Sequence, residues 1–384
     1  MLDRASALRE ELSQIRRAIH RHPELGYEEI ATADLAAEYL RRLGLRVATG
    51  VARTGVIGYL GEGRPVVMLR ADMDALQMEE LNDVPYASRR PGLMHACGHD
   101  AHVACLLGAA KLLAADPPAG QVRFLFQPSE EGADAEGRHG GERVMLEGHV
   151  DDLDAVFGLH CEPRLLSGTI GLREGTLTFA SDTFQGAVLG RSAHGARPHE
   201  GVDAIALAAN VVTALNQVVA RRVAPLDSAV ITVGTINGGT RPNIVAGRVT
   251  LSGTLRSAKE ETRQLLFAEV ERAFRVGETL GGDYELHIEH GCPAVVNDAS
   301  LTALVQGVAE ELLGTANVVH AEPVMASEDF SFLISKAPGC FFRLGTGLPG
   351  EPARVIHSPT FDIAEAALPV GAALLAAVAR RYLA

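Results

Sequence analysis

Hydrophobic and polar positions along the first half of the chain predict helices that alternate with buried strands. Apolar residues recur at helical spacing from Leu8 to Ile19, and this pattern predicts a helix that ends before Pro23. A second helix is expected over residues 31–43. Apolar strands that alternate with helices are typical of a largely parallel sheet covered by helices. Three short runs are apolar throughout and predict such strands at residues 65–69, 122–126 and 155–159.

Polar residues follow each of these three runs. Asp72 and Asp74 follow the first run, Glu130 and Glu131 the second, and His160 the third. Ligands of open α/β sheets bind just beyond the carboxyl ends of the strands. The strand pattern therefore predicts a functional site at that edge of the sheet.

The pattern changes near residue 180. It then predicts a helix over residues 202–219 and two strands, at residues 229–233 and 248–255, that alternate between apolar and polar positions as half-exposed antiparallel strands do. Beyond Pro293 the earlier alternation of helices and strands returns. We therefore expect an α/β protein whose first domain is interrupted by a smaller α+β domain. The expected bounds are residues 1–180 and 292–384 for the first domain and 181–291 for the inserted one.

Composition and charge narrow the class of protein. The 384 residues are 47% hydrophobic, enough for a large core, and the formal net charge of −13 argues against nucleic acid and anionic membrane surfaces as partners. The sequence contains no run of about 18 apolar residues, so no transmembrane helix is expected. The charged start of the chain does not resemble a signal peptide. Five scattered cysteines do not suggest a disulfide framework. The expected compartment is the cytoplasm.

The stretch of residues 94–102 concentrates side chains that bind metal ions. It contains three histidines, one cysteine and one aspartate within nine positions, and these groups bind borderline-soft divalent metals such as zinc. Cys97 and His99 flank Gly98, which permits tight backbone geometry. A lone Cys-x-His pattern would fit a buried structural cysteine equally well. The neighbouring histidines favour metal ligation.

Acidic and imidazole groups further along the chain suggest water activation at that metal. Glu130 and Glu131 end an apolar run, so a solvated helix face is the less favoured interpretation of this pair. Neighbouring side chains at a strand end point in different directions. One carboxylate can therefore ligate metal while the other takes a proton from water and returns it to a leaving amine. His160 and His357 add neutral nitrogen ligands, although either histidine alone would more often be structural.

Eight sequence blocks together identify a family resemblance. The chain resembles the zinc aminoacylase and carboxypeptidase family, in particular its branch of hippurate hydrolases and auxin–amino-acid conjugate hydrolases. The resemblance runs nearly end to end. Its blocks are HRHPELG at residues 20–26, LRADMDAL at 69–76, MHACGHDAH at 94–102, QPSEEG at 127–132, GLH at 158–160, SAHGARPH at 192–199, RPNIV at 241–245 and SEDF at 327–330.

The resemblance implies two divalent metal ions in a metallopeptidase-like catalytic domain. Glu130 falls on the position of the general base, and Asp74 on that of an acid that orients a ligand. The wider family has a metal-binding histidine where this chain has Asp72, so the bridging ligand stays open. Zinc is the expected metal, with manganese, cobalt or nickel as alternatives. The implied ligands are Cys97, His99, Glu131, His160 and His357.

The resemblance also assigns the inserted domain as a lid and dimerisation domain. His194 matches a histidine that completes the active site, commonly across a homodimer, and Asn243 and Arg256 match groups that bind the substrate carboxylate. Each has a simpler explanation as a turn or surface residue. A bidentate guanidinium suits a carboxylate, and an imidazole can support a developing oxyanion.

Residues 133–141 depart from the short glycine-rich link expected in this branch. The segment begins beside the proposed ligands and could shape the acyl pocket, but a solvated surface insertion is the favoured interpretation.

These features predict a metal-dependent amidohydrolase that cleaves N-acyl amino acids with metal-activated water and Glu130 as general base. A dipeptidase or carboxypeptidase with the same centre is the alternative. A non-catalytic metal- or ligand-binding module is disfavoured, because such a module does not need an acid beside its ligand Glu131. The acyl group and the amino acid stay open.

Overall fold

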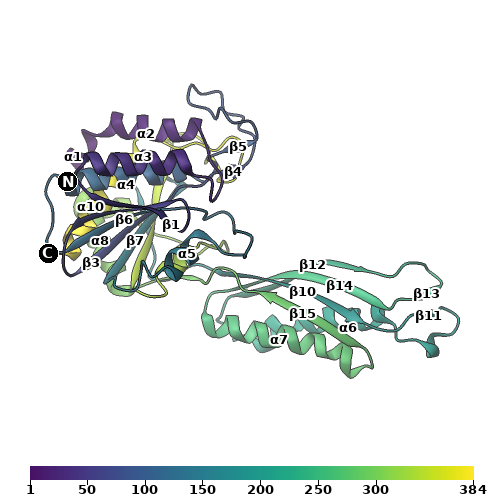
Figure 1. Cartoon of the computed structure of the whole chain (residues 1–384). Coiled ribbons are helices and arrows are strands. Elements are labelled where there is room, and N and C mark those ends of the chain that lie inside the picture. The colour runs from purple at the N-terminus through teal and green to yellow at the C-terminus, as the bar shows by residue number, and fades with distance from the viewer. The chain divides into compact units, whose positions relative to one another are not determined.

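The computed structural model describes residues 1–384, and the chain divides into two compact units (Figure 1). The first unit consists of Met1–Leu177, Val296–Glu322 and Asp329–Ala384. The second consists of Thr178–Val295, and the short segment Pro323–Glu328 from the last part of the chain also belongs to it.

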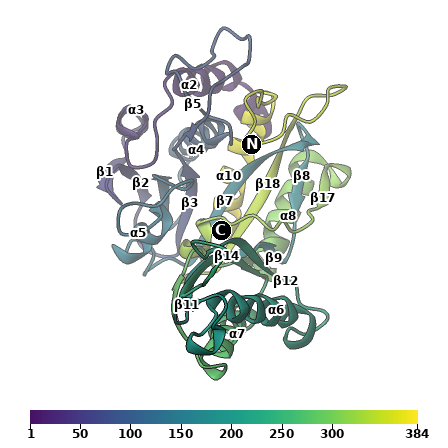
Figure 2. The ribbon, with the colours of Figure 1, turned by 90° about the vertical axis from the view of Figure 1, so that its right-hand side faces the viewer.

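An eight-stranded sheet forms the centre of the first unit (Figure 2). Its middle strands β6, β3, β7 and β18 run parallel, which confirms the predicted largely parallel sheet, whereas β1 and β2 extend it antiparallel at one edge. At the other edge β8 pairs antiparallel with β18 and parallel with β17. In spatial order the strands are β1 (Arg46–Val51), β2 (Gly55–Gly61), β6 (Gln121–Gln127), β3 (Val66–Asp72), β7 (Ala155–Leu166), β18 (Gly339–Gly347), β8 (Ile170–Leu172) and β17 (Val318–His320).

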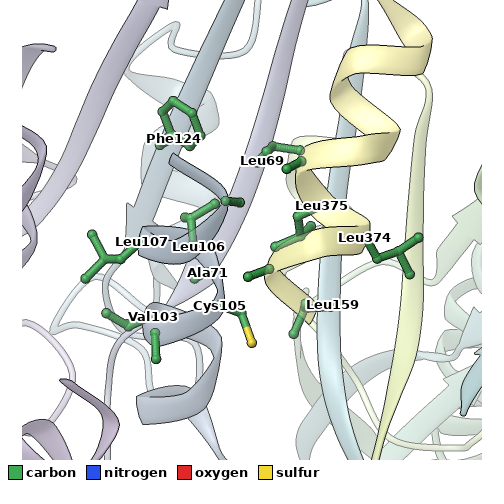
Figure 3. Packing of buried hydrophobic residues seen from close by; sticks show 14 of the residues in the cluster. Leu69, Ala71, Val103, Cys105, Leu106, Leu107, Phe124, Leu159, Leu374 and Leu375 are labelled. Carbon is green, nitrogen blue, oxygen red and sulfur yellow. The ribbon is translucent and has the colours of Figure 1, made fainter. Parts of the chain in front are cut away.

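Two helices, α4 and α10, pack against each other and against the middle strands (Figure 3). Gly108 allows the close approach, since a Cβ there would lie 2.8 Å from the Cβ of Ala372. Leu106 of α4, Leu375 of α10 and Leu69 of β3 are fully buried at this layer. The helices of this unit are α1 (Leu2–Ser6), α2 (Arg9–Arg21), α3 (Ile30–Arg42), α4 (His99–Ala114), α5 (Gly140–Leu146), α8 (Ala299–Leu313), α9 (Phe330–Leu333) and α10 (Ala367–Tyr382), with a short 3-10 turn at Thr315–Asn317.

The strands of the first unit are longer than the apolar runs that predicted them. β3 continues through Asp72, and β7 continues through His160 to Leu166, so both residues lie within strands and not after their ends. The expectation that His160 follows its strand is therefore wrong. Polar side chains are buried and paired at these positions, so hydrophobicity alone does not reveal where the strand ends.

A four-stranded antiparallel sheet with two helices forms the second unit (Figure 1). Its core joins Phe184 of β10, Leu255 of β14 and Phe274 of α7. A two-stranded ribbon of β11 (Ala193–His194) and β13 (Ile244–Val245) is attached where Gly190 N–H donates to the Gly247 carbonyl oxygen. The sheet order is β12 (Ala229–Gly238), β14 (Arg248–Ser257), β10 (Ala180–Leu189) and β15 (Asp283–Glu289), and the helices are α6 (Ala204–Arg222) and α7 (Glu260–Thr279).

Helix α6 is long and apolar enough to cross a membrane by length and composition alone, with a mean hydropathy of 1.3. The helix packs instead against α7 and the sheet strands of its own unit. Leu207, Val211 and Leu215 on its inner side are buried, whereas Asn210 and Thr213 are exposed. This division between an apolar and a polar side is that of a helix covering a sheet.

The remaining short strands form two further pairs. β4 (Leu76–Gln77) pairs with β5 (Leu93–Met94), and β9 (Gly175–Thr178) pairs with β16 (Val295–Asn297). The first pair leads directly into the turn that begins α4, which places the 94–102 stretch at the edge of the parallel strands.

Candidate metal centre

The first unit brings the five predicted ligands together from four separate parts of the chain. Cys97 and His99 lie at the start of α4, where Gly98 adopts a left-handed conformation with φ of 95°. Glu131 follows β6, His160 lies on β7, and His357 precedes α10. The turn at Gly98 is tight because a Cβ there would lie 3.1 Å from the Cβ of Cys161.

The ligand atoms form two groups that share Cys97. In one group, Cys97, His99 and His160 offer ligand atoms within 4.8 Å of one another, and all three residues are buried. In the other, Cys97, Glu131 and His357 do the same at a more open position. The Nε2 atom of His357 lies 3.0 Å from Oε1 of Glu131, and Sγ of Cys97 lies 3.3 Å from Nε2 of His160. Cys97 is therefore common to these two groups, and Glu131 also lies within 4.8 Å of a His99 ring nitrogen.

Hydrogen bonds at the Nδ1 atoms of two imidazoles orient their Nε2 atoms towards the ligand groups. His99 Nδ1 lies 3.2 Å from Asp74 Oδ1, and His160 Nδ1 donates to the Cys161 carbonyl oxygen at 2.7 Å. Each ring thereby presents Nε2 to the group, in the manner typical of metal-binding histidines. His99 Nε2 is buried and has no hydrogen-bond partner. A buried, oriented and unpaired nitrogen beside a thiol and carboxylates fits a divalent metal ion.

Charge in this cluster also favours a cation. Burial, followed by the nearby Glu131 and Glu130 carboxylates, raises the pKa of the Cys97 thiol well above its ordinary value. Burial alone would lower the pKa of His99, but the carboxylates of Asp72 and Asp74 raise it to about 10. The side chains thus concentrate negative charge in a buried place, and a divalent cation would offset their repulsion.

Two of the three histidines in the 94–102 stretch lie outside these groups. His102 is near Asp72 and His99, but its Nδ1 lies 2.5 Å from Asp72 Oδ1 and its Nε2 accepts the Cys161 N–H at 2.9 Å. Both of its nitrogens are therefore used. His95 is buried, and burial lowers its pKa to about 4. Asp72 accepts from Arg70 at 2.6 Å through its other oxygen, so it acts as a partner of His102 and Arg70 in the structure.

The turn after β6 presents Glu130 and Glu131 side by side. Ser129 adopts a left-handed conformation with φ of 49°, and Glu131 N–H donates to Asp74 Oδ2 at 2.8 Å. One carboxylate oxygen of Asp74 thus contacts His99. The other accepts from the turn that carries Glu130 and Glu131, which we call the glutamate turn. Carboxylate oxygens of Glu130 and Glu131 lie within 4.8 Å of a His99 ring nitrogen.

A buried ionic network supports the centre, and the sequence analysis missed it. Arg16 is 0% exposed. Its Nε donates to Asp100 at 2.7 Å and its Nη2 to Asp362 at 2.8 Å. Arg16 thereby joins the start of α4 to the segment that carries His357. The same segment is also held by a backbone hydrogen bond, in which the His357 N–H donates to the Ala96 carbonyl oxygen at 2.8 Å. The available signal was weak: an arginine on the same side of a helix as the apolar residues Leu12 and Ile19.

Within residues 133–141, the first seven form a surface loop that one buried side chain holds in place, and Gly140 and Gly141 begin α5. Most side chains of the loop are exposed, as a surface insertion would be, but the Asp134 side chain is only 1% exposed. Its carboxylate pairs with Arg143 and, at 3.0 Å, with Arg53. Tyr27 Oη donates to the Arg138 carbonyl oxygen at 2.8 Å, and His139 Nδ1 lies 3.0 Å from the Glu130 carbonyl oxygen. The loop is therefore fixed next to the glutamate turn.

The predicted substrate-binding residues lie in the second unit, in two places. His194 and Asn243 are close together at the β11–β13 ribbon, where Gly195 N–H donates to the Asn243 carbonyl oxygen at 2.8 Å. Arg256 is the second-last residue of β14 and lies near the opposite end of that strand from the ribbon. At about 3.3 Å per strand residue, more than ~20 Å separates Arg256 from the ribbon end of the strand.

A family model covers most of the chain. Residues 68–381 match the model described as peptidase family M20/M25/M40. These residues include all five predicted ligands together with Asp74 and Glu130.

Curated relatives and a solved structure match nearly the whole chain. An IAA-amino acid hydrolase (ILR1-like 4) from Arabidopsis thaliana is 39% identical over 96% of this chain and 85% of its own length. An N-acetyl-L-cysteine deacetylase from Bacillus subtilis is 38% identical over 98% of this chain and 89% of its own length. The crystal structure of the YxeP protein from Bacillus subtilis, described as a dinuclear metal-binding peptidase of the M20 family, has a TM-score of 0.84 and 31% identity over 98% of this chain and 99% of that one.

Proposed function

The chain belongs to the peptidase family M20/M25/M40, and we propose that within this family of hydrolases it is a metal-dependent amidohydrolase that cleaves N-acyl amino acids to a carboxylic acid and a free amino acid. The observation that carries the proposal is the pair of ligand groups that share Cys97, with Glu130 beside them. The two relatives compared above are named for hydrolysis of an acylated amino acid, indole-acetyl in one case and N-acetyl in the other.

Two divalent metal ions would be held by these two groups, and Cys97 is a candidate ligand in both. His99 and His160 would complete one site, and Glu131 and His357 the other. When bound, such ions polarise an amide carbonyl and lower the pKa of a water molecule. Sulfur and imidazole donors favour zinc, and cobalt, nickel or manganese would also fit.

Glu130 is assigned the proton transfers. Glu131 Oε1 lies 3.0 Å from His357, so Glu131 is assigned to a ligand group with His357 and Cys97. Glu130, the half-buried residue before it, is in neither of the two groups that contain Cys97. Glu130 would accept a proton from the attacking water as the C–O bond forms. It would then donate that proton to the nitrogen as the C–N bond breaks. Asp74 would position both His99 and Glu131 through its two oxygens.

In this proposal, two subunits of a homodimer contribute residues to each active site. Arg256 would bind the α-carboxylate, while His194 and Asn243 would complete the active site of a partner subunit. The separation of Arg256 from the β11–β13 ribbon supports this division, because one small substrate cannot reach both ends of β14 in a single chain. The second unit also has an edge strand, β12, with β14 as its only ladder partner in the sheet. Such an edge is a surface on which two copies can meet.

The cytoplasm is the proposed compartment. All five cysteines are buried and none is in a disulfide, which supports a reducing environment.

Metal removal and reloading test the function. The chelated protein should lose all hydrolysis of a panel of N-acyl amino acids, and reloading with zinc, cobalt, nickel or manganese should restore it. The panel should contain acetyl, benzoyl and indole-acetyl compounds, each matched with a dipeptide that carries a free α-amino group. Efficient cleavage of the dipeptides in preference to the acylated compounds would identify a dipeptidase instead. Full activity in rigorously metal-free protein would refute the metal-dependent mechanism.

A further inference from the structure

Residues 24–29, which overlap the end of the sequence block at 20–26, lie against the turn that carries Glu130 and Glu131. The Glu24 carbonyl oxygen accepts the Ala75 N–H at 2.8 Å, immediately after Asp74. Gly26 faces Ser129 so closely that a Cβ at Gly26 would lie 2.2 Å from Ser129 Oγ. This segment has no ligand and no proton-transfer role in the function proposed above, so its contacts need a separate explanation.

Glu29 is the buried end of this segment. It is 0% exposed, and its Oε1 accepts the Ser129 N–H at 2.7 Å. Its other oxygen, Oε2, accepts from Thr54 Oγ1 at 2.6 Å. Both carboxylate oxygens are thus bound to groups of fixed position, and the acid contacts the backbone one residue before Glu130.

Ser129 adopts a backbone conformation that needs support. Its φ of 49° is unfavourable for a residue with a side chain, and such conformations persist only where neighbouring structure holds them. Ser129 Oγ donates to the Gly132 carbonyl oxygen at 2.8 Å, and the Ser129 carbonyl oxygen accepts the Gly140 N–H at 2.9 Å. The Glu29 contact supplies the remaining restraint, at the Ser129 amide.

Two buried carboxylates therefore bracket Glu130. Glu29 binds the amide of the residue before it, and Asp74 binds the amide of the residue after it at 2.8 Å. We propose that Glu29 is a positioning residue that sets the direction of the Glu130 side chain by holding Ser129 in its left-handed conformation. The inference rests on the proposed role of Glu130 as the proton-transfer group.

The protonation state of Glu29 indicates which substitution preserves this contact. Burial, followed by the nearby Asp74 carboxylate, raises the pKa of Glu29 to about 7. A neutral side chain of the same shape should therefore serve. Glutamine can accept the Ser129 N–H through Oε1 and donate to Thr54 Oγ1 through its amide nitrogen. Glu29→Gln is the matched control for Glu29→Ala, which removes both hydrogen bonds.

Steady-state kinetics on the metal-loaded protein test the proposal. Displacing a catalytic group by about 1 Å can cost ~10²-fold in rate, so Glu29→Ala should lose kcat by that order with little change in KM. Its metal content should equal that of the wild type. Glu29→Gln should keep kcat within about threefold, because both hydrogen bonds are retained. Equal kcat in the alanine and glutamine variants, or loss of bound metal in Glu29→Ala alone, would overturn the proposal.

A size swap at the neighbouring contact between Gly26 and Ser129 tests the position of Ser129 without removing Glu29. Gly26→Ala should push Ser129 away and lower kcat, whereas Ser129→Gly removes the opposing side chain and permits the left-handed conformation. The double variant Gly26→Ala with Ser129→Gly should recover most of the lost kcat. A double variant no better than Gly26→Ala would overturn the inference, and this arm decides the question if Glu29→Ala does not fold.

Hydrogen exchange separates a failure of this inference from a failure of the proposed function. The Ser129 amide should exchange faster in Glu29→Ala than in the wild type and stay protected in Glu29→Gln. If the wild type hydrolysed no N-acyl amino acid, the proposed function would fail. The exchange data would still test whether Glu29 holds the Ser129 amide. Unchanged protection of the Ser129 amide in Glu29→Ala would overturn the inference.

Discussion

Replacing Arg16 by methionine should destabilise the first unit far more than the same change at Arg17. Arg16 is fully buried and contacts Asp100 at 2.7 Å and Asp362 at 2.8 Å. Arg17, the next residue of α2, is 41% exposed and pairs with Glu365 at 2.6 Å. The two changes remove the same positive charge from the same helix, so they differ chiefly in burial.

The expected magnitudes follow from that difference. Removing one partner of a buried ion pair typically costs ~3–5 kcal/mol, because the remaining charge stays buried without compensation. His20 Nδ1 lies 2.8 Å from Asp100, and the raised pKa of His20 lets it compensate in part, so the lower part of that range is expected for Arg16→Met. An exposed pair contributes ~0.2–1 kcal/mol, which is the expected cost of Arg17→Met.

The cost of Arg16→Met should also depend on pH. Burial alone would raise the pKa of Asp100, but Arg16 and His20 hold it well below its ordinary value. A carboxylate with a lowered folded-state pKa contributes stability above its unfolded pKa, and this stability is lost as the pH falls. Without Arg16 that contribution shrinks, so the deficit should be largest near neutral pH. It should diminish as the pH falls through the ordinary aspartate value of about 3.9 towards the lower folded-state pKa.

Urea unfolding of the metal-free proteins, followed by circular dichroism at several pH values, measures these differences. Metal-free protein is used because metal binding would add its own stabilisation. Two results would refute the reasoning: equal destabilisation by the two substitutions, or a deficit in Arg16→Met that is the same in mild acid and at neutral pH.

Three further predictions concern the proposed active site. Glu130→Gln should keep its metal and lose ~10²–10⁴-fold in rate, whereas Glu131→Gln should lose metal; metal analysis showing the reverse would exchange their roles. Arg256→Ala should lower kcat/KM about ten- to a hundredfold for free-acid substrates and far less for α-amides, since a charge-assisted hydrogen bond contributes ~1.5–3 kcal/mol; Arg248→Ala, on the same strand, is the control and should not discriminate. Mixed Glu130→Gln and His194→Ala subunits should regain activity if His194 acts across a dimer, and proven subunit exchange without recovery would contradict that arrangement.

Local sequence patterns were sufficient for the parallel sheet and for the kind of side chains at its edge. The apolar runs at residues 65–69 and 155–159 correspond to parts of β3 and β7, because a strand buried on both faces must be apolar along its length. The same patterns misjudged where β7 ends. His160 is a buried polar residue within the strand, and its burial depends on the neighbours that surround it.

The metal-binding character of the site was also visible in the sequence. Cys97 and His99 are two residues apart, and their chemistry alone suggests a metal. The sequence could not show that Cys97 belongs to both ligand groups, since this depends on Glu131, His160 and His357 approaching from other parts of the chain. The role of His102 was equally undetermined, because a histidine within a metal-binding stretch is excluded as a ligand only when the partners of its ring nitrogens are known.

The chemistry of the site residues and the largely parallel sheet were thus determined by the sequence itself, whereas the positioning contacts were decided by the tertiary structure. Arg16 and Asp362 are 346 positions apart, and Glu29 and Ser129 are 100 positions apart. Periodicity reports which side of an element is buried, but it carries no information about which distant residue lies opposite. A buried arginine or glutamate reveals its role only through the partner that compensates its charge, and folding alone brings the two together.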